Sequence, residues 1–552
     1  QASSNNIAIG NQAAIKCFTA GVNVAIGWNA GCGGTGSTLS ATANVFVGKY
    51  AGRNITSGDS NVFLGERAGG QAEVTGNYNI AFGKCSAASL TSGADNIALG
   101  RDALGGATNT GTDNIALGAE SGQLVTSGQY NVFLGDKAGQ CATSGSSNFI
   151  GGYGAGRCNG TASQNVKIGY MSGKDGTGSH VIAIGAEAGR HGTTHGCSIF
   201  IGKAAGGCMC SGSTNIALGT NALLGSSTLA DNTAYCNIAI GYEAGKASTT
   251  ANFNTLIGHQ SGQAVTTGTN NISIGKWAGY YVTTAINNTY VGGSAGVCRQ
   301  TGNNNVAIGL DAFAGSATPG DNTGGYNTII GATAGYVVTS GSNNTFLGND
   351  AGRSTTTGSY NTFLGKNAGC CLTTGCENIF IGCGAGANGI MTADHNIGLG
   401  VEAGRKITSG AQNVHIGYKP GAELTTAQGT VFIGQETAEK RQTGNHNIAL
   451  GTQALYGDST PANNTASYNI SLGSYAGKNV TSGNYNLYFG HATGCLTTDG
   501  HSNIALGCKA LQGNVSADFN IAIGPQAGQL IGAGGCNVFM GYGAATSNGT
   551  AT

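Results

Sequence analysis

The chain has 552 residues, of which 101 are glycine, only 4 are proline and 9% are charged, against about 25% charged residues in an ordinary soluble domain. Glycine does not recur at every third position, which excludes collagen, and 40% hydrophobic residues with a formal net charge of +0 exclude the disordered class. Without a basic excess, neither nucleic acid nor an anionic membrane is an expected partner, and no apolar run reaches the ~18 residues of a membrane span.

One short phrase recurs from end to end: Asn, apolar, any residue, apolar, Gly. It is present at 6–10 near the start and at 520–524 near the end. The closing glycine usually returns after 17 residues, as from Gly241 to Gly258, and about thirty-one copies are found. A fixed period of this kind predicts a β-solenoid. We therefore expect residues 1–552 to form one continuous all-β array.

Each copy opens with an extended piece. Alternation in the first copy places Ile7 and Ile9 on one face and Ala8 on the other. The Asn before this piece returns in nearly every copy, with three exceptions, Val181, Ser198 and Thr430. Stacked amides bond to one another along a fibre axis, so we expect an asparagine ladder. A row of amides that bind a ligand is the alternative interpretation.

The rest of each copy contains a small corner residue and a second extended piece. The corner is usually an Ala-Gly pair, such as Ala351-Gly352, and an apolar-Thr pair with Ser-Gly or Thr-Gly follows, as at 338–341. These glycines mark turns, so a copy is expected to be one coil of a narrow two-sheet solenoid. Three or four buried apolar side chains, at about 1.5–3 kcal/mol each, do not offset the ~1–2 kcal/mol per residue of ordering a coil. Only stacked coils are stable.

Three steps between copies are 22 residues long instead of 17. In each, the glycine after the corner alanine becomes Leu or Phe, and an insert with Asp-Asn-Thr or Asn-Asn-Thr follows. These segments are 222–237, 312–327 and 454–469. We expect the large apolar residue to support a longer surface loop. Such loops are candidate contact points, and a tolerated insertion without a function is the alternative.

The phrase Asn-Ile-Ala-Ile-Gly, followed by x-x-Ala-Gly, resembles the head repeats of trimeric autotransporter adhesins and similar arrays in phage and virus fibres. The resemblance covers essentially the whole chain and implies a left-handed β-roll with an adhesive or fibrous role at a surface. The sequence differs from that family in its longer repeat and its 17 cysteines, and we expect neither a heptad stalk nor a membrane anchor within these residues.

The cysteines show no recurrent metal-ligand spacing and favour an oxidising compartment. The coil register makes disulfide candidates of Cys17 with Cys32, Cys141 with Cys158, Cys197 with Cys208 or Cys210, Cys495 with Cys508, and two bridges among Cys370, Cys371, Cys376 and Cys383. Five thiols remain, namely Cys85, Cys236, Cys298, Cys536 and whichever of Cys208 and Cys210 stays unpaired. They are expected to form intermolecular bridges or to remain free cysteines.

Several Asn-x-Ser/Thr sequons fall in second pieces or loops and are candidate glycosylation sites. They are Asn54, Asn159, Asn463, Asn479, Asn514 and Asn548. His191 and His195 have the i, i+4 spacing of a metal site, but such a site needs a helix, and none is expected. No metal, no cofactor and no catalytic group are predicted, and the chain is not expected to be an enzyme.

The expected function is that of a structural, extracellular or cell-surface protein that polymerises with itself. If the last residue of one copy met the first of the next, the step from Gly541 to Gly10 would be 21 residues, which equals the step from Gly27 to Gly48. We therefore expect head-to-tail stacking into a filament, with lateral association or intermolecular disulfides as further contacts. The alternatives are an adhesin head that binds glycans or cell surfaces, and an ice-binding face, which would need a flat Thr-x-Thr array.

Overall fold

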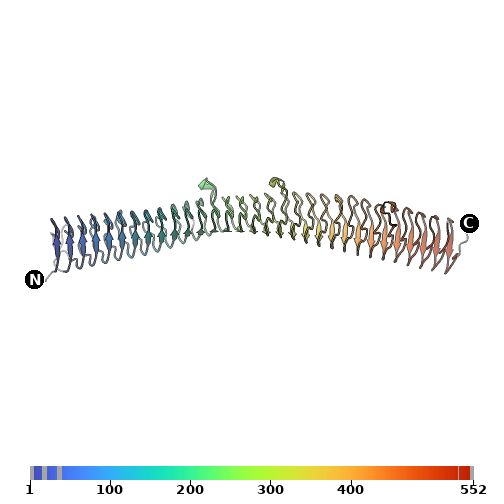
Figure 1. Ribbon diagram of the computed structural model, residues 1–552, viewed down its shortest axis with the longest axis horizontal. Coiled ribbons are helices and arrows are strands. Elements are labelled where there is room, and N and C mark those ends of the chain that lie inside the picture. The colour runs from blue at the N-terminus through green and yellow to red at the C-terminus, as the bar shows by residue number, and fades with distance from the viewer. Residues whose placement is uncertain (1–4, 15–20, 34–39, 195, 533, 547–552) are drawn as a thin grey trace. The chain divides into compact units, whose positions relative to one another are not determined.

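The computed structural model describes residues 5–14, 21–33, 40–194, 196–532 and 534–546. The chain divides into two compact units, Gln1–Lys276 and Trp277–Thr552. In each unit, short parallel strands lie side by side, one from each turn (Figure 1). The described residues contain three short 3-10 helices besides the strands, and no helix among them is long and apolar enough to span a membrane.

Every strand is three residues long. Unit 1 contains β1 (Ile7–Ile9), β2 (Val24–Ile26), β3 (Val45–Val47), β4 (Val62–Leu64), β5 (Ile80–Phe82), β6 (Ile97–Leu99), β7 (Ile115–Leu117), β8 (Val132–Leu134), β9 (Phe149–Gly151), β10 (Val166–Ile168), β11 (Ile182–Ile184), β12 (Ile199–Ile201), β13 (Ile216–Leu218), η1 (Leu229–Asp231), β14 (Ile238–Ile240), β15 (Thr255–Ile257) and β16 (Ile272–Ile274). Unit 2 contains β17 (Thr289–Val291), β18 (Val306–Ile308), η2 (Pro319–Asp321), β19 (Thr328–Ile330), β20 (Thr345–Leu347), β21 (Thr362–Leu364), β22 (Ile379–Ile381), β23 (Ile397–Leu399), β24 (Val414–Ile416), β25 (Val431–Ile433), β26 (Ile448–Leu450), η3 (Pro461–Asn463), β27 (Ile470–Leu472), β28 (Leu487–Phe489), β29 (Ile504–Leu506), β30 (Ile521–Ile523) and β31 (Val538–Met540).

The predicted all-β solenoid is confirmed, with about thirty-one turns and a usual period of 17 residues, as between Ile238 and its partner Thr255. The expected second sheet is wrong. In the described residues the second piece forms no strand: it contributes isolated bridges, such as Leu372 with Met391, and a few backbone bonds from one turn to the next. In one of these contacts, the backbone N–H and the Oγ1 hydroxyl of Thr339 both donate to the carbonyl of Thr356, at 2.8 and 3.1 Å. The turn that follows within two residues ends the extended piece before a strand forms.

The asparagine ladder is confirmed. The backbone N–H and the Nδ2–H of Asn344 both donate to Oδ1 of Asn327, each at 3.0 Å. Asn361 donates the same two bonds to Oδ1 of Asn344, and Nδ2 of Asn344 also donates to the carbonyl of Gly358 at 2.9 Å. The Asn344 side chain is buried, and these bonds occupy its amide group. The column therefore holds adjacent turns together and offers no ligand-binding amide at this position.

The middle residue of each strand points inward. In unit 2, the rings of Phe346, Phe363 and Phe380 stack on successive turns with centroids 4.7 and 5.5 Å apart. The corner glycine makes room for them, because a Cβ on Gly352 would lie 2.5 Å from a ring carbon of Phe346. Ala351 beside it is fully buried. The tight corner predicted from the Ala-Gly pair is therefore confirmed.

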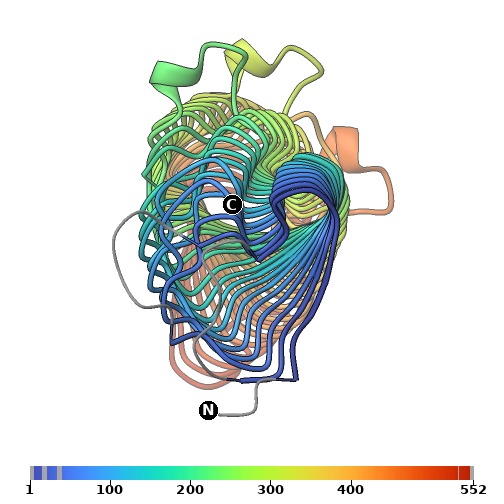
Figure 2. The same ribbon diagram turned by 90° about the vertical axis from the view of Figure 1, so that its left-hand side faces the viewer.

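The three long steps form loops that project from their own unit (Figures 1 and 2). Leu223, Phe313 and Leu455 are fully buried beneath them, as expected. Each loop is closed by one asparagine. In the second loop, Oδ1 of Asn322 accepts the N–H of Ser316 at 2.9 Å, and its Nδ2 donates to the carbonyl of Ser316 within the loop and to that of Cys298 in the preceding turn, each at 3.0 Å.

A long buried side chain precedes each loop by one turn. The guanidinium of Arg299 donates to the carbonyls of Val338, Thr339 and Gly324 at 2.6, 3.2 and 3.0 Å. Val338 and Thr339 belong to the turn after the loop, so Arg299 reaches across the turn whose second piece has been displaced into the loop. Arg441 and Met209 occupy the corresponding place before the other two loops and are equally buried.

Replacing the ladder residue Asn344 with alanine should lower the free energy of unfolding by about 1–3 kcal/mol, because the N–H of Asn361 loses its acceptor inside the protein. Urea unfolding and hydrogen exchange at Asn361 measure this change. The control is Asn349→Ala, whose exposed amide donates to the carbonyl of Ala332. Equal stability of the two variants would contradict a structural ladder.

Arg299→Ala should destabilise unit 2 by about 3–5 kcal/mol, since it opens a cavity and leaves the carbonyl of Val338 without a donor. The carbonyls of Thr339 and Gly324 keep the N–H of Gly324 and the amide of Asn305 as donors. Arg299→Met should cost less than half as much, because methionine fills the same place at Met209. Thermal and urea unfolding compare the two. If the methionine variant were as unstable as the alanine variant, the volume of the Arg299 side chain would not be its main contribution to stability.

Candidate functional site

The outer surface of the strands is the most uniform surface of the chain. In β2 to β30 the middle side chain of each strand is buried, and the first and third point outward and are partly exposed. We call the surface formed by these first and third residues the outward face. Ile, Val and Leu fill most of it, and the other residues are Phe82, Phe149, Gly151, Thr255, Thr289, Thr328, Thr345, Thr362, Phe489 and Met540. No charged or amide side chain occupies an outward position in any described strand.

The alternation expected from the repeat phrase is therefore confirmed, and its more apolar face points outward. In a sheet with one side in water, the outward residues are ordinarily polar. Here Phe82 is 58% and Phe489 53% exposed. Contiguous exposed apolar surface marks an interaction site. Column-by-column reading of the phrase contains this signal, because charges are missing from its second and fourth positions.

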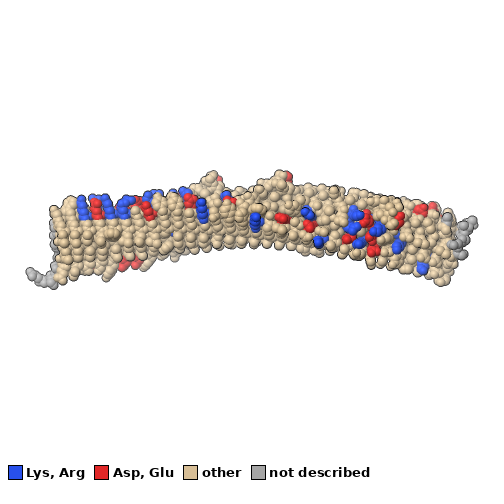
Figure 3. Space-filling view, viewed as in Figure 1, with Lys and Arg blue, Asp and Glu red and all other residues tan. Residues whose placement is uncertain are grey.

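Two columns border the outward face. The leading margin is the residue two positions before each strand, and the trailing margin is the residue two positions after it. The leading margin has a left-handed backbone, with φ near +60° at Tyr130 and Tyr485, and these two rings are 61% and 63% exposed. The trailing margin carries several lysines. In Figure 3 the charged side chains of unit 1 gather mainly along one edge, and the outward face itself remains uncharged.

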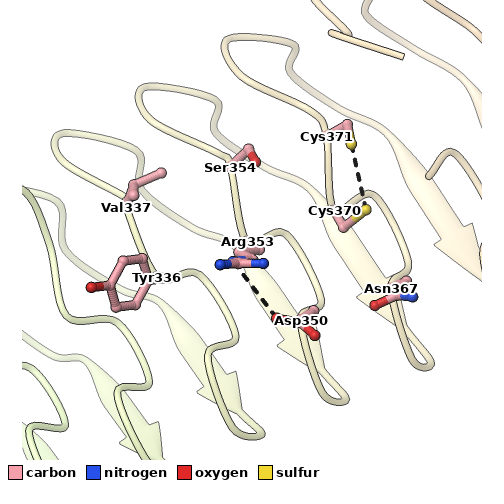
Figure 4. Close-up of a pocket in the computed structure, with 8 residues that line it drawn as sticks. All are labelled: Tyr336, Val337, Asp350, Arg353, Ser354, Asn367, Cys370 and Cys371. Carbon is pink, nitrogen blue, oxygen red and sulfur yellow. Dashed lines mark hydrogen bonds and ion pairs between the residues drawn. The ribbon is translucent and has the colours of Figure 1, made fainter. Parts of the chain in front are cut away.

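Unit 2 contains a pocket of about 620 Å³ on its surface (Figure 4). It is lined by Tyr336, Val337, Asp350, Arg353, Ser354, Asn367, Cys370 and Cys371. The thiols of Cys370 and Cys371 lie 3.6 Å apart. Burial, with the neighbouring Cys371, raises the pKa of Cys370 to about 12, and its thiol donates to the carbonyl of Ala387 at 3.0 Å. A protonated thiol is a poor nucleophile, so Cys370 is not an activated thiol.

Two ionisable side chains take inward positions in the strands. Burial lowers the pKa of Lys167 to about 7, and its ammonium donates to Oδ1 of Asn159 at 2.8 Å and to the carbonyl of Gly176 at 2.9 Å. Burial lowers the pKa of His415 to about 3. Lys167 is held by its own turn and the one before it, His415 contacts the next turn, and the two lie in different units. They are structural.

His415 belongs to a small buried network with Thr430, which replaces the ladder asparagine. The Thr430 hydroxyl donates to Oδ1 of Asn413 at 2.6 Å. Its oxygen is therefore the acceptor for Nε2–H of His415 at 3.0 Å, and the ring stacks on Phe432 with centroids 5.0 Å apart. His191, by contrast, is partly exposed and contacts Asp175 at 3.0 Å. His195 lies outside the described residues, in which no group of three His, Cys, Asp or Glu side chains is arranged for a metal.

Every described cysteine carries a free thiol, so the disulfide pairs remain predictions, and Cys17 lies outside the described residues. Cys141 and Cys158 share a column on adjacent turns. Burial is the main cause of the raised pKa of Cys158, and the neighbouring Cys141 raises it further. Cys32, Cys208, Cys210, Cys376 and Cys495 are partly buried. The exposed thiols lie on the two margins of the outward face: Cys197 and Cys536 on the leading margin, and Cys383 and Cys508 on the trailing margin.

The predicted glycosylation sites differ in access. Asn159 and Asn514 are fully buried, and each amide bonds the backbone three residues later. A glycan on either one is incompatible with this fold. Asn463 is exposed on η3, and Asn54 and Asn479 are partly buried. Asn548 lies outside the described residues. No protein-family model matches the chain, and no curated protein is significantly similar to it.

His415→Phe should remove one source of acid sensitivity. The pKa of a histidine in the unfolded chain is about 6.5, so below that pH the unfolded state binds more protons and the wild type loses stability as the pH falls toward 3. The variant should gain about 2–3 kcal/mol over the wild type between pH 7 and pH 4. Urea unfolding at both pH values measures this, with the exposed His446→Phe as control. If the difference in free energy of unfolding between the variant and the wild type did not change with pH, the buried His415 would not be neutral in the folded state.

Proposed function

We propose that the chain is a structural subunit of an extracellular filament, in which copies associate laterally through the outward face and also stack head to tail. The uncharged outward face carries this proposal. Inward positions accept Lys167, His415 and Tyr290, whereas outward positions accept no charge. A surface that faces water can carry charged side chains, whereas a surface that packs against an apolar partner excludes them.

A second copy of the chain is the partner whose shape fits. Outward side chains repeat along each unit with the ~4.8 Å spacing of paired strands, and another surface with the same spacing can interdigitate with them over its full length. A three-residue strand is about 10 Å long and lies ~4.8 Å from the next strand, so each turn contributes ~50 Å² to the outward face. The strands of one unit together therefore present close to the ~800 Å² that each partner buries in a stable interface.

Head-to-tail stacking is the proposed axial contact. Successive strands within each unit pair in the same parallel register, as Ile397 with Val414 and Val414 with Val431. A turn of one copy thus has the strand and the asparagine that a turn of another copy needs above it. The extracellular location is supported by the many cysteines, which suit an oxidising environment.

A surface adhesin that binds glycans is the second candidate, and the leading margin favours it. Tyr78, Tyr130, Tyr326 and Tyr360 are each between 61% and 65% exposed. Exposed rings of this kind combine an apolar body with a polar tip and are common at recognition surfaces. A glycan array distinguishes the two functions. An adhesin should bind a defined glycan and lose that binding when a leading-margin Tyr is replaced with Ala, whereas a purely structural subunit should bind none.

Placing two lysines on the outward face, Ile381→Lys with Ile416→Lys, should weaken lateral association at least tenfold, because an unpaired charge is costly to bury. The matched control, Asn349→Lys with Gln435→Lys, adds the same charge at exposed trailing-margin positions. Analytical ultracentrifugation and negative-stain imaging report assembly, and circular dichroism reports the fold. Normal bundles from the outward-face variant would refute the proposed contact.

A further inference from the structure

We infer that copies joined through the outward face lie parallel and in register, with the leading margin of one copy against the trailing margin of its neighbour. This inference rests on the lateral association proposed above and adds its direction and register. It follows from the distribution of charge on the two margins.

The two margins differ in the sign of their charge. The charged residues of the leading margin are Asp95, Asp113 and Glu377, all acidic and exposed, and its described residues include no Lys or Arg. The trailing margin is mainly basic, with Lys49, Lys84, Arg101, Lys203, Lys276 and Lys366 against the acidic Glu66 and Asp136. Each copy thus has an acidic and a basic border on either side of an uncharged face.

Symmetry decides which borders meet. When two facing copies run in the same direction, they are related by rotation about the stacking axis, and each leading margin lies against the trailing margin of the other copy. When they run in opposite directions, the twofold axis crosses the stack, and each margin meets its own kind. The second arrangement places acid against acid and base against base. Complementary borders favour the first arrangement and suppress the second.

The turn positions of the acidic residues limit the axial shift between facing copies to at most about one turn. Asp95 precedes β6 and Arg101 follows it, so these two residues meet when the same turns face each other. Asp113 precedes β7, one turn away from Arg101. Glu377 precedes β22, one turn away from Lys366 after β21. Each acidic side chain of the leading margin therefore comes within about one turn, or ~5 Å along the axis, of a basic one.

Aromatic residues of the leading margin select the packing without an axial shift. Tyr78 precedes β5 and Lys84 follows it, and Tyr360 and Lys366 flank β21 in the same way. Tyr78 and Tyr360 are each 61% exposed. An in-register parallel contact places a lysine ammonium of one copy beside an exposed ring of the other, which is a favourable cation–π arrangement.

Charge reversal on one margin tests the direction. Asp95→Lys, Asp113→Lys and Glu377→Lys together should weaken assembly about tenfold at low ionic strength, where surface charges are least screened. Adding Lys84→Glu, Arg101→Glu and Lys366→Glu to the same chain should restore it. In an antiparallel contact the first variant would assemble like the wild type, because a uniformly acidic pair of borders only becomes a uniformly basic pair.

A direct readout is negative-stain imaging of full-length chains that carry a gold label at the N-terminus. Label at one end of laterally paired copies is the expected result, and label at both ends would overturn the inference. Unchanged assembly of the leading-margin variant, or no restoration by the combined variant, would overturn it as well. If the wild type forms no lateral pairs at all, the proposed function fails instead, so the two failures are distinguishable.

Discussion

The buried asparagine ladder is the constraint on which the rest of the structure depends. Most ladder asparagines bond the turn before them through two donors and the turn after them through one acceptor oxygen, as Asn344 does. A strand that slipped by one residue would place its asparagine outside and its apolar residues inside. Because the ladder prevents this, the second and fourth positions of every phrase remain outward. The uncharged face is thus a consequence of the ladder.

Departures from the repeat are tolerated because a neighbouring turn changes with them. Gly398 is the middle residue of β23, where a Cβ would lie 2.8 Å from the ring of Phe380 in the turn before. His415 faces the turn in which Thr430 replaces asparagine. Arg299 precedes a turn whose second piece has left the stack. The compensating residue lies one turn away in the first two cases, and Arg299 reaches two turns to Val338, because a coil of a solenoid contacts only its near neighbours.

The sequence alone predicted the period, the ladder, the tight corner and the supported loops, because each of these requires one residue type at one place in every turn. The sequence did not predict the features that depend on contacts between residues of different turns. The second piece contains strand-like residues such as Val338 and Thr339, but it is too short to pair as a strand. Asn159 has a good sequon and is buried because Lys167 requires its oxygen. Arg299 was not identified, since nothing local shows that a side chain spans an entire turn.

In a repeat protein, the same position recurs in every turn. The positions can therefore be ranked by how narrow a range of residue types each one contains. The inward column is the one that physical chemistry should restrict most, since a buried polar group must find a partner. It nevertheless contains Lys167, Ser273, Tyr290 and His415. The outward columns, where a lysine would be well solvated, contain no charge in any described strand, and charge returns two residues further on at the margins. A boundary this narrow matches the edge of a contact surface: charges are excluded where two copies would pack and are kept at the rim, where they can select the direction of the partner.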